Sequence, residues 1–257
     1  MLGTADHGKV YNVLENVRDA ETSKCVERGM GSARSAAPRW VGAIRVGRQV
    51  RELYVVIENP RRLVKALEFF DHFKVKVRGI SDSTKHVQGV VVLDSYGRKY
   101  LADNNIPVNG YVVDIDVQGL EKGIAMAIIC SKTLMINPLK RLIVGIDYGK
   151  NIGVAVIAND DVVYTGSYRS AEEAVNDIGF FVYNVESEVK IIRIGIAQDI
   201  DENFANTIVE RFKDVAHIEF VPEYKSSRHK YMLEDTKLAT DEIAAINIAF
   251  YRSKEVT

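Results

Sequence analysis

The sequence predicts an α/β protein of two domains. Short runs of β-branched and apolar residues, typical of buried strands, alternate with stretches whose apolar residues recur at the 3.6-residue period of a helix. The 257 residues suffice for two domains at about 150 residues per domain. With 47% hydrophobic and 27% charged residues, the composition is that of a globular protein with a sizeable core, not of a disordered chain.

Small residues and charge divide the chain into three segments. We expect an arm or linker over residues 1–38, which ends in the small-residue stretch GMGSARSAAP, a small basic α/β domain over 39–138, and a second domain over 139–257. Residues 1–140 carry 21 Lys and Arg against 15 Asp and Glu, whereas residues 141–257 carry 13 against 20. A basic domain beside an acidic one suits a protein that holds nucleic acid with one part and cations with the other, although solvated charged faces have the same composition.

The sequence gives no sign of a membrane or secreted protein. No apolar run has the length of a bilayer-spanning helix, and the N-terminus lacks the basic-then-apolar order of a signal peptide. Cys25 and Cys130 show neither metal-ligand spacing nor a disulfide framework, so we interpret them as packing thiols in a reducing compartment. We therefore expect a cytoplasmic protein.

The first domain shows alternating strand and helix signals. Asn59 and Pro60 form a good helix opening, with an N-cap acceptor followed by proline at the first helical position. The expected strands are Leu53–Ile57, Val75–Val77, Val90–Leu93 and Tyr111–Ile115, and a closing helix is expected over Gly119–Cys130.

Five arginines of this domain suggest a phosphate-contacting patch. Three of them recur every third residue and two follow nearby: Arg45, Arg48, Arg51, Arg61 and Arg62. A solvated basic face is the simpler alternative. Two histidines of the domain, His72 and His86, have no partner that the sequence reveals, and we expect them to be structural or exposed.

The second domain is organised around the stretch RLIVGIDYGKNIGVAVI, Arg141 to Ile157. It reads as an apolar strand ending in Asp147, a tight turn for which Gly149 supplies backbone freedom, and a second apolar strand. An acid at a strand end can face a cleft with its neighbours fixed by the sheet, as a metal-binding carboxylate requires, but it can also simply cap a turn.

The remaining elements of this domain follow in the order βββαβαβα. Three strands joined by short turns predict an antiparallel meander, and strands separated by helices must be parallel neighbours, so the sheet is expected to be mixed. The expected elements are strands at Ile143–Ile146, Val154–Ile157 and Val162–Thr165, a helix over Ala171–Val182, a strand at Ile191–Ala197, a helix over Ala205–Phe212, a strand at His217–Val221 and a last helix over Thr240–Arg252.

Four segments of this domain, in order, resemble the RuvC and YqgF group of the ribonuclease H-like superfamily. GIDYGKNIGVAV resembles the opening motif, IRIGIAQDIDENFANTIVERF the fourth strand with its loop and helix, VPEYKSS a short YqgF segment, and DEIAAINIAFY the closing helix. The resemblance covers about residues 141–252 and implies a ribonuclease H-like fold. The first domain resembles no family that we recognise.

Carried over position by position, the resemblance implies that Asp147, Glu223 and Asp241 line one catalytic site. Carboxylates that lie close together repel, and a bound divalent cation relieves the repulsion, so we expect these three residues to bind Mg²⁺ or Mn²⁺. Two such ions about 4 Å apart can orient a water and steady the leaving oxygen in phosphodiester hydrolysis. Asp241 and Glu242 also follow Thr240, an expected N-cap, and acids in a first helical turn are favoured without any catalytic role.

The sequence departs from the group's pattern at several positions. Ala197 and Gln198 stand in the fourth strand where RuvC-type enzymes have a glutamate, and the nearest acids are Asp199, Asp201 and Glu202. Pro222 and Tyr224 replace an acid and an arginine of the YqgF pattern, so a complete two-metal site is not assured. Further along, residues Lys225, Arg228, His229 and Lys230 lie in a polar stretch that suits either phosphate contact or a solvated loop.

Three functions compete. The first is a metal-dependent nuclease, a hydrolase acting on a DNA junction or structured RNA, and the second is a catalytically inactive nucleic-acid-binding or scaffold protein of the same fold. The third, an actin-like ATPase, needs a duplicated domain, for which the 117 residues from Arg141 onward are too few. The sequence leaves the oligomeric state open, although junction-resolving relatives act as homodimers on two-fold substrates.

Overall fold

The computed structural model describes residues 49–81, 83–133, 139–196, 202–222 and 238–251. The chain divides into two compact units, residues 1–41 and 42–257, and every described residue belongs to the second. That unit contains two β-sheets, one of four strands and one of five. The predicted arm over 1–38 lies outside the described residues.

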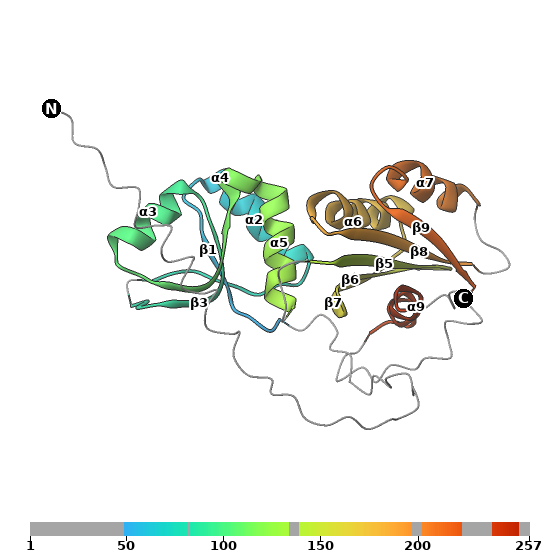
Figure 1. The fold of residues 1–257 in the computed structure, drawn as a ribbon, viewed down its shortest axis with the longest axis horizontal. Helices are drawn as coiled ribbons and strands as arrows, with labels where there is room; N and C mark the ends of the chain where they lie inside the picture. The colour runs from blue at the N-terminus through green and yellow to red at the C-terminus, as the bar shows by residue number, and fades with distance from the viewer. Residues whose placement is uncertain (1–48, 82, 134–138, 197–201, 223–237, 252–257) are drawn as a thin grey trace, which may run out of the picture. The chain divides into compact units, whose positions relative to one another are not determined.

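The first sheet is entirely parallel, with the strand order β2-β1-β3-β4. Its strands are β1 (Leu53–Val56), β2 (Val77–Arg78), β3 (Val87–Leu93) and β4 (Val108–Asp114), and its helices are α2 (Pro60–His72), α3 (Ser95–Asp103), α4 (Ile115–Gln118) and α5 (Leu120–Lys132) (Figure 1). Helix α2 begins as the sequence predicts, since the Asn59 side chain accepts hydrogen bonds from the backbone N–H groups of Arg61 and Arg62. Because every connection is a crossover, the loops that follow the strands meet at the carboxyl edge of the sheet.

The second sheet is mixed and has the strand order β7-β6-β5-β8-β9. Strands β5 (Arg141–Tyr148), β6 (Ile152–Ala158) and β7 (Asp161–Tyr168) form the antiparallel meander, and β8 (Val189–Ile196) and β9 (His217–Pro222) add parallel to β5. With α6 (Ala171–Asn184), α7 (Glu202–Phe212) and α9 (Thr240–Ala249), the order is βββαβαβα, which confirms the ribonuclease H-like fold predicted from the sequence.

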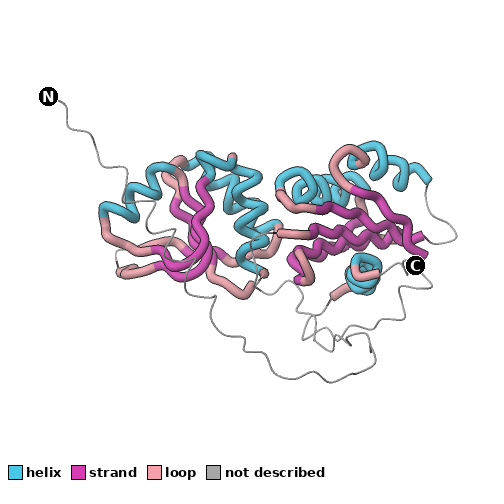
Figure 2. Tube along the Cα trace, in the orientation of Figure 1, coloured by secondary structure: helices cyan, strands magenta, loops and turns pink. Residues whose placement is uncertain are grey.

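Helices cover both faces of the second sheet. Helices α6 and α7 lie on one face, and α9 is the helix that the described residues place on the other, as Figure 2 also shows. Apolar residues of β5 alternate between the two sides: Leu142, Val144 and Ile146 belong to the main hydrophobic core, whereas Ile143 packs in a separate cluster with α9. The sheet is therefore buried on both sides, and a polar side chain on it needs a specific environment.

Helix α3 is absent from the sequence prediction. Its sequence SYGRKYLAD buries only Gly97 and Leu101, so it carries no apolar stripe that periodicity would reveal. The helix is instead initiated by Asp94, whose carboxylate accepts a hydrogen bond from the backbone N–H of Gly97 at 2.8 Å. The last helix also differs from its prediction, because α9 ends at Ala249 and the expected end, Arg252, lies outside the described residues.

The structure bears on two expectations from the sequence, one about membrane-spanning helices and one about the cysteines. Among the described residues, no helix combines the length and apolar character needed to cross a bilayer. Cys130 is a buried free thiol in α5, and burial raises its pKa to about 12, which agrees with a packing role. Cys25 lies outside the described residues.

Helix α5 also ends in a buried lysine. The Lys132 side chain is only 6% exposed, and its ammonium donates a hydrogen bond to the backbone carbonyl of Phe73 at 3.1 Å. Burial, and to a smaller extent the charge of Lys74, together lower the Lys132 pKa to about 8. Because the unfolded chain keeps its lysine protonated up to about pH 10.4, the unfolded state binds more protons than the folded state between these values.

We predict that Lys132→Met stabilises the fold at pH 7 by about 3 kcal/mol at most, since one pKa unit corresponds to about 1.4 kcal/mol. The advantage should shrink as the pH rises from 8 to 10.5, where the wild type no longer has to bury a charge. Urea unfolding of both proteins across this range measures the difference in unfolding free energy. A difference that does not change with pH would contradict a buried, titrating ammonium.

Candidate functional site

Asp147 faces helix α9. Side chains alternate along β5, so Gly145 and Asp147 lie on the same face of the sheet. A Cβ atom built on Gly145 would lie 2.1 Å from the backbone oxygen of Ala245 in α9, which identifies this face as the one that α9 covers. The half-buried Asp147 side chain therefore lies on the α9 side of the sheet, two residues after Gly145.

Gly153 brings Asp147 and Asp241 to the same corner of the sheet. It is the antiparallel partner of Asp147, and directly opposed residues share a face with Cβ atoms about 5 Å apart. A Cβ atom on Gly153 would lie 2.0 Å from the backbone oxygen of Asp241. The first turn of α9 thus packs onto Gly153, the residue beside Asp147, while a shared catalytic site for the two aspartates stays a prediction.

Two polar groups fix the Asp241 carboxylate. Its Oδ2 atom accepts hydrogen bonds from the Asn151 side-chain amide and the Ser167 hydroxyl, both at 3.1 Å. Ser167 stands opposite Gly153 on the neighbouring strand β7, and Asn151 lies in the turn between β5 and β6. Within the described ranges, no hydrogen bond reaches the other oxygen, Oδ1. This oxygen is an acceptor that a cation can use.

Glu242 has a different, structural role. It is buried, and its Oε2 atom accepts a hydrogen bond from the Ala239 backbone N–H at 2.8 Å, which caps the start of α9. Ala239 is the N-cap and Thr240 the first helical residue, so the prediction that Thr240 caps this helix is wrong. The structure thus separates two adjacent acids that the sequence could not distinguish.

Several predicted site residues fall outside the described residues. Glu223 directly follows Pro222, the last residue of β9, and its place in the site stays a prediction. The same holds for the acids Asp199 and Asp201, for Ala197 and Gln198, for Tyr224, and for the basic residues Lys225, Arg228, His229 and Lys230. Glu202, the remaining acid of that group, begins α7.

The donors at this corner fit a magnesium or manganese ion. In the described part of the chain, no group of three or more His, Cys, Asp or Glu side chains gathers at one point. Mg²⁺, however, is commonly held by one or two carboxylates together with waters and substrate phosphates. Asp147 and Asp241 supply two carboxylates, with oxygen donors of Ser167 and Asn151 beside them.

Gly149 does not have the role that its sequence suggests. Its φ is outside the left-handed region, and a Cβ atom on it would meet only the Asn151 backbone oxygen at 3.7 Å, an ordinary contact. The expectation that the turn needs its backbone freedom is therefore wrong. The glycines that the site requires are Gly145 and Gly153, and the signal for them is their position in strands where no turn explains them.

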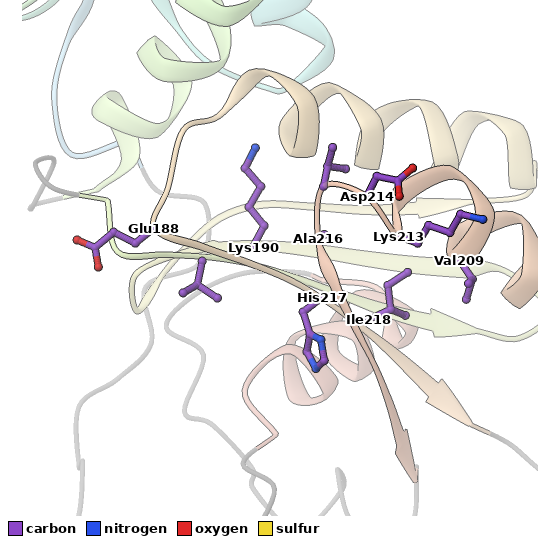
Figure 3. A pocket seen from close by; sticks show the side chains of 10 residues that line it. Glu188, Lys190, Val209, Lys213, Asp214, Ala216, His217 and Ile218 are labelled. Carbon is purple, nitrogen blue, oxygen red and sulfur yellow. The ribbon is translucent and has the colours of Figure 1, made fainter.

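A hollow of about 500 Å³ lies at the opposite end of the same sheet (Figure 3). It is lined by the starts of β8 and β9, and β8 begins beside Arg141, six residues from Asp147. Lys190 and His217 point to opposite sides of the sheet, and the Lys190 ammonium is bound to the Val182 carbonyl at 2.6 Å. These groups do not converge on one ligand.

A second hollow, of about 560 Å³, lies at the carboxyl edge of the first sheet. Arg62 lines it, but this guanidinium is bound to the Asp116 carboxylate and to the Ile115 carbonyl. The hydrogen bond from Arg62, followed by one from the Ser95 backbone N–H, lowers the Asp116 pKa to about 2. Arg62 is thus a structural partner and not a free member of the predicted arginine patch.

His72 has a partner that the sequence did not reveal. Its Nε2 atom lies 2.8 Å from Oδ2 of Asp177 in α6, and the same carboxylate oxygen accepts hydrogen bonds from the hydroxyls of Tyr168 at 2.5 Å and Tyr164 at 3.2 Å. Burial raises the pKa of both tyrosines, so their hydroxyls stay protonated and keep donating. The cluster joins α2 to α6.

Comparisons with known proteins add little to this description. No protein-family model matches the chain, and no curated protein matches it. One similar solved structure is a Bacteroides thetaiotaomicron VPI-5482 protein described as having an actin-like ATPase fold and unknown function. It is 8% identical, the match covers 62% of this chain and 74% of that one, and the TM-score is 0.24, which is too low to support an argument.

We predict that Gly153→Ala displaces α9 and lowers the unfolding free energy by about 1–3 kcal/mol, the usual range for overpacking. The added methyl would lie 2.0 Å from a backbone atom of α9, which cannot move without moving the helix. Gly149→Ala, four residues earlier in an open position, is the matched control and should leave the stability nearly unchanged. Equal stability of the two variants in urea unfolding would contradict close packing of α9 at Gly153.

Proposed function

We propose that this protein is a metal-dependent nuclease of RuvC or YqgF type, which hydrolyses phosphodiester bonds in structured DNA or RNA. The observation that carries the proposal is the placement of Asp147 and Asp241 on either side of Gly153, on one face of a ribonuclease H-like sheet. The resemblance of four ordered sequence segments to that group supports the choice of reaction.

Each described residue of this corner has a part in the proposed site. Asp147 and Asp241 hold Mg²⁺ or Mn²⁺ through their carboxylates, and Ser167 and Asn151 keep the Asp241 carboxylate in one orientation. Glu223 is the proposed third carboxylate. When bound, the ions would lower the pKa of the attacking water and place positive charge beside the leaving oxygen.

The rigid surroundings of the two aspartates support a preorganised centre. Both ends of α9 are bound: Asp241 at its start to Ser167 and Asn151, and the Ala249 carbonyl at its end to the Arg193 guanidinium at 2.6 Å. Carboxylates fixed by a sheet and an anchored helix keep their spacing when charged, which is what a divalent cation requires.

We predict that wild-type protein binds Mn²⁺ and that Asp147→Asn and Asp241→Asn each weaken the binding by more than the roughly 10–100-fold loss typical of outer-shell partners. Isothermal titration calorimetry measures this without knowledge of the substrate. Asp160→Asn is the control, because Asp160 is an exposed aspartate whose side chain pairs with Arg141 at 3.3 Å, and it should bind like the wild type.

Cleavage is then assayed on junctions, forks and structured RNAs with Mg²⁺ or Mn²⁺. Activity that disappears in both site variants and persists in Asp160→Asn is the expected result. Absence of Mn²⁺ binding both to the free protein and in the presence of these nucleic acids would overturn the metal site. The catalytically inactive nucleic-acid-binding protein would then be the better description.

A further inference from the structure

A groove of about 480 Å³ at the amino edge of the first sheet is lined mainly by cations. Four cationic side chains surround a single carboxylate, that of Glu52. We call it the basic groove, and its charged lining residues are Arg51, Lys74, Lys76, Arg78 and Glu52. The two hollows described above lack this imbalance: the one at the starts of β8 and β9 mixes acids and bases, and the one at the carboxyl edge of the first sheet is mostly acidic.

The fold brings these residues together from separate segments. Helix α2 starts at the carboxyl end of β1 and runs back for 13 residues, about 20 Å, so that its end lies beside the start of β1. Lys74 and Lys76 follow the helix and lead into β2, which pairs with β1 from Leu53 onward. The groove is therefore formed by the start of β1, the end of α2 and the edge strand β2.

Two of the cations are available to a ligand. Lys74 and Lys76 are exposed, and in the described part of the chain neither ammonium has a carboxylate partner. Arg78 is paired with Glu52 at 2.7 Å, and its side chain is 64% exposed, so it stands at the rim. Glu52 is the only carboxylate among the described residues that line the groove, so this ion pair accounts for it.

Arg51, which lines the same groove, has a fixed position. Its NH1 atom donates to the backbone carbonyls of Cys130 and Thr133, and its guanidinium lies 5.3 Å from the centre of the Tyr111 ring. It thus contributes positive charge to the groove without reaching out of it. For the three described arginines the predicted patch is wrong: Arg51 belongs to the amino edge of the sheet, and Arg61 and Arg62 open α2 at the opposite edge. Arg45 and Arg48 lie outside the described residues.

We propose that the basic groove binds the phosphodiester backbone of a nucleic acid, with Lys74 and Lys76 in direct contact with phosphates; this rests on the proposed function, which supplies the nucleic acid. A lysine ammonium is a compact point charge that binds phosphate without demanding a fixed geometry. The described residues that line the groove include no aromatic side chain, so they offer charge but no stacking surface for bases. Contacts of this kind hold and position a substrate regardless of its sequence.

The test is a binding measurement that does not depend on the metal site. Fluorescence anisotropy with labelled duplex DNA, single-stranded DNA and hairpin RNA is recorded in EDTA at several salt concentrations. Lys74→Glu/Lys76→Glu should weaken binding at least roughly tenfold, and the salt slope should fall by about 2 because two phosphate contacts are lost. Lys74→Gln/Lys76→Gln removes the charges without reversing them and should weaken binding to a smaller extent.

The control is Arg61→Glu/Lys99→Glu, which changes the net charge by the same amount. Both residues are exposed, one in the first turn of α2 and one in α3, away from the groove. This variant should bind nearly as well as the wild type. Circular dichroism and thermal melting verify that all variants are folded.

The outcomes separate the groove from the catalytic proposal. Equal losses in the groove variants and the control variant would overturn the basic groove as a specific surface, while nucleic-acid binding and the nuclease proposal would stand. Binding that persists in Asp147→Asn but falls in the lysine variants supports the groove whether or not cleavage is found. Failure of the wild type to bind any of the three nucleic acids at low salt would overturn the groove and the proposed substrate class together.

Discussion

The close approach of α9 to the second sheet is the constraint on which the candidate site depends. A helix normally packs about 10 Å from a sheet because side chains separate them, but here Gly145 and Gly153 leave the backbone of α9 in direct contact with β5 and β6. This contact brings the first turn of the helix to the corner where β5 ends. Any side chain at Gly153 would separate Asp241 from Asp147.

Helix α9 is held by apolar packing along its length and by polar contacts at both ends. Its middle and its last residue pack through apolar side chains, Ala245, Ile246 and Ala249, against Ile143 and Ala155 of the sheet. Its end is bound by Arg193, which also pairs with Glu219 at 2.7 Å on the neighbouring strand. Burial supplies the free energy and the polar contacts at both ends set the register, so the position of Asp241 is determined by the sheet as a whole.

The sequence predicted the second sheet well because its signals are local. Short turns specify the meander, apolar stripes specify α6 and α7, and the apolar runs place Asp147 near the end of β5 and Asp241 in the first turn of α9. The sequence predicted less of the domain that contains the first sheet. Helix α3 was not predicted because it is initiated by the Asp94 cap and has no apolar stripe that would reveal it.

Partners distant in the sequence could not be predicted. Arg62 pairs with Asp116, 54 residues away, and His72 with Asp177, 105 residues away, and nothing local indicates either contact. The regular spacing of Arg45, Arg48 and Arg51 suggested a shared face, but Arg51 lies just before β1, where its neighbours are set by tertiary packing. Ser167 and Asn151 were missed for the same reason, since their link to Asp241 depends on strand register.

Alternation along β5 has a consequence for natural variation. Ile143, Gly145 and Asp147 occupy one face and Leu142, Val144 and Ile146 the other, so inserting or deleting one residue between them would turn the carboxylate away from α9 and bury it among apolar side chains. Homologues that keep the site must therefore keep this segment at constant length. Differences in length should accumulate instead in the turns and loops that join the strands.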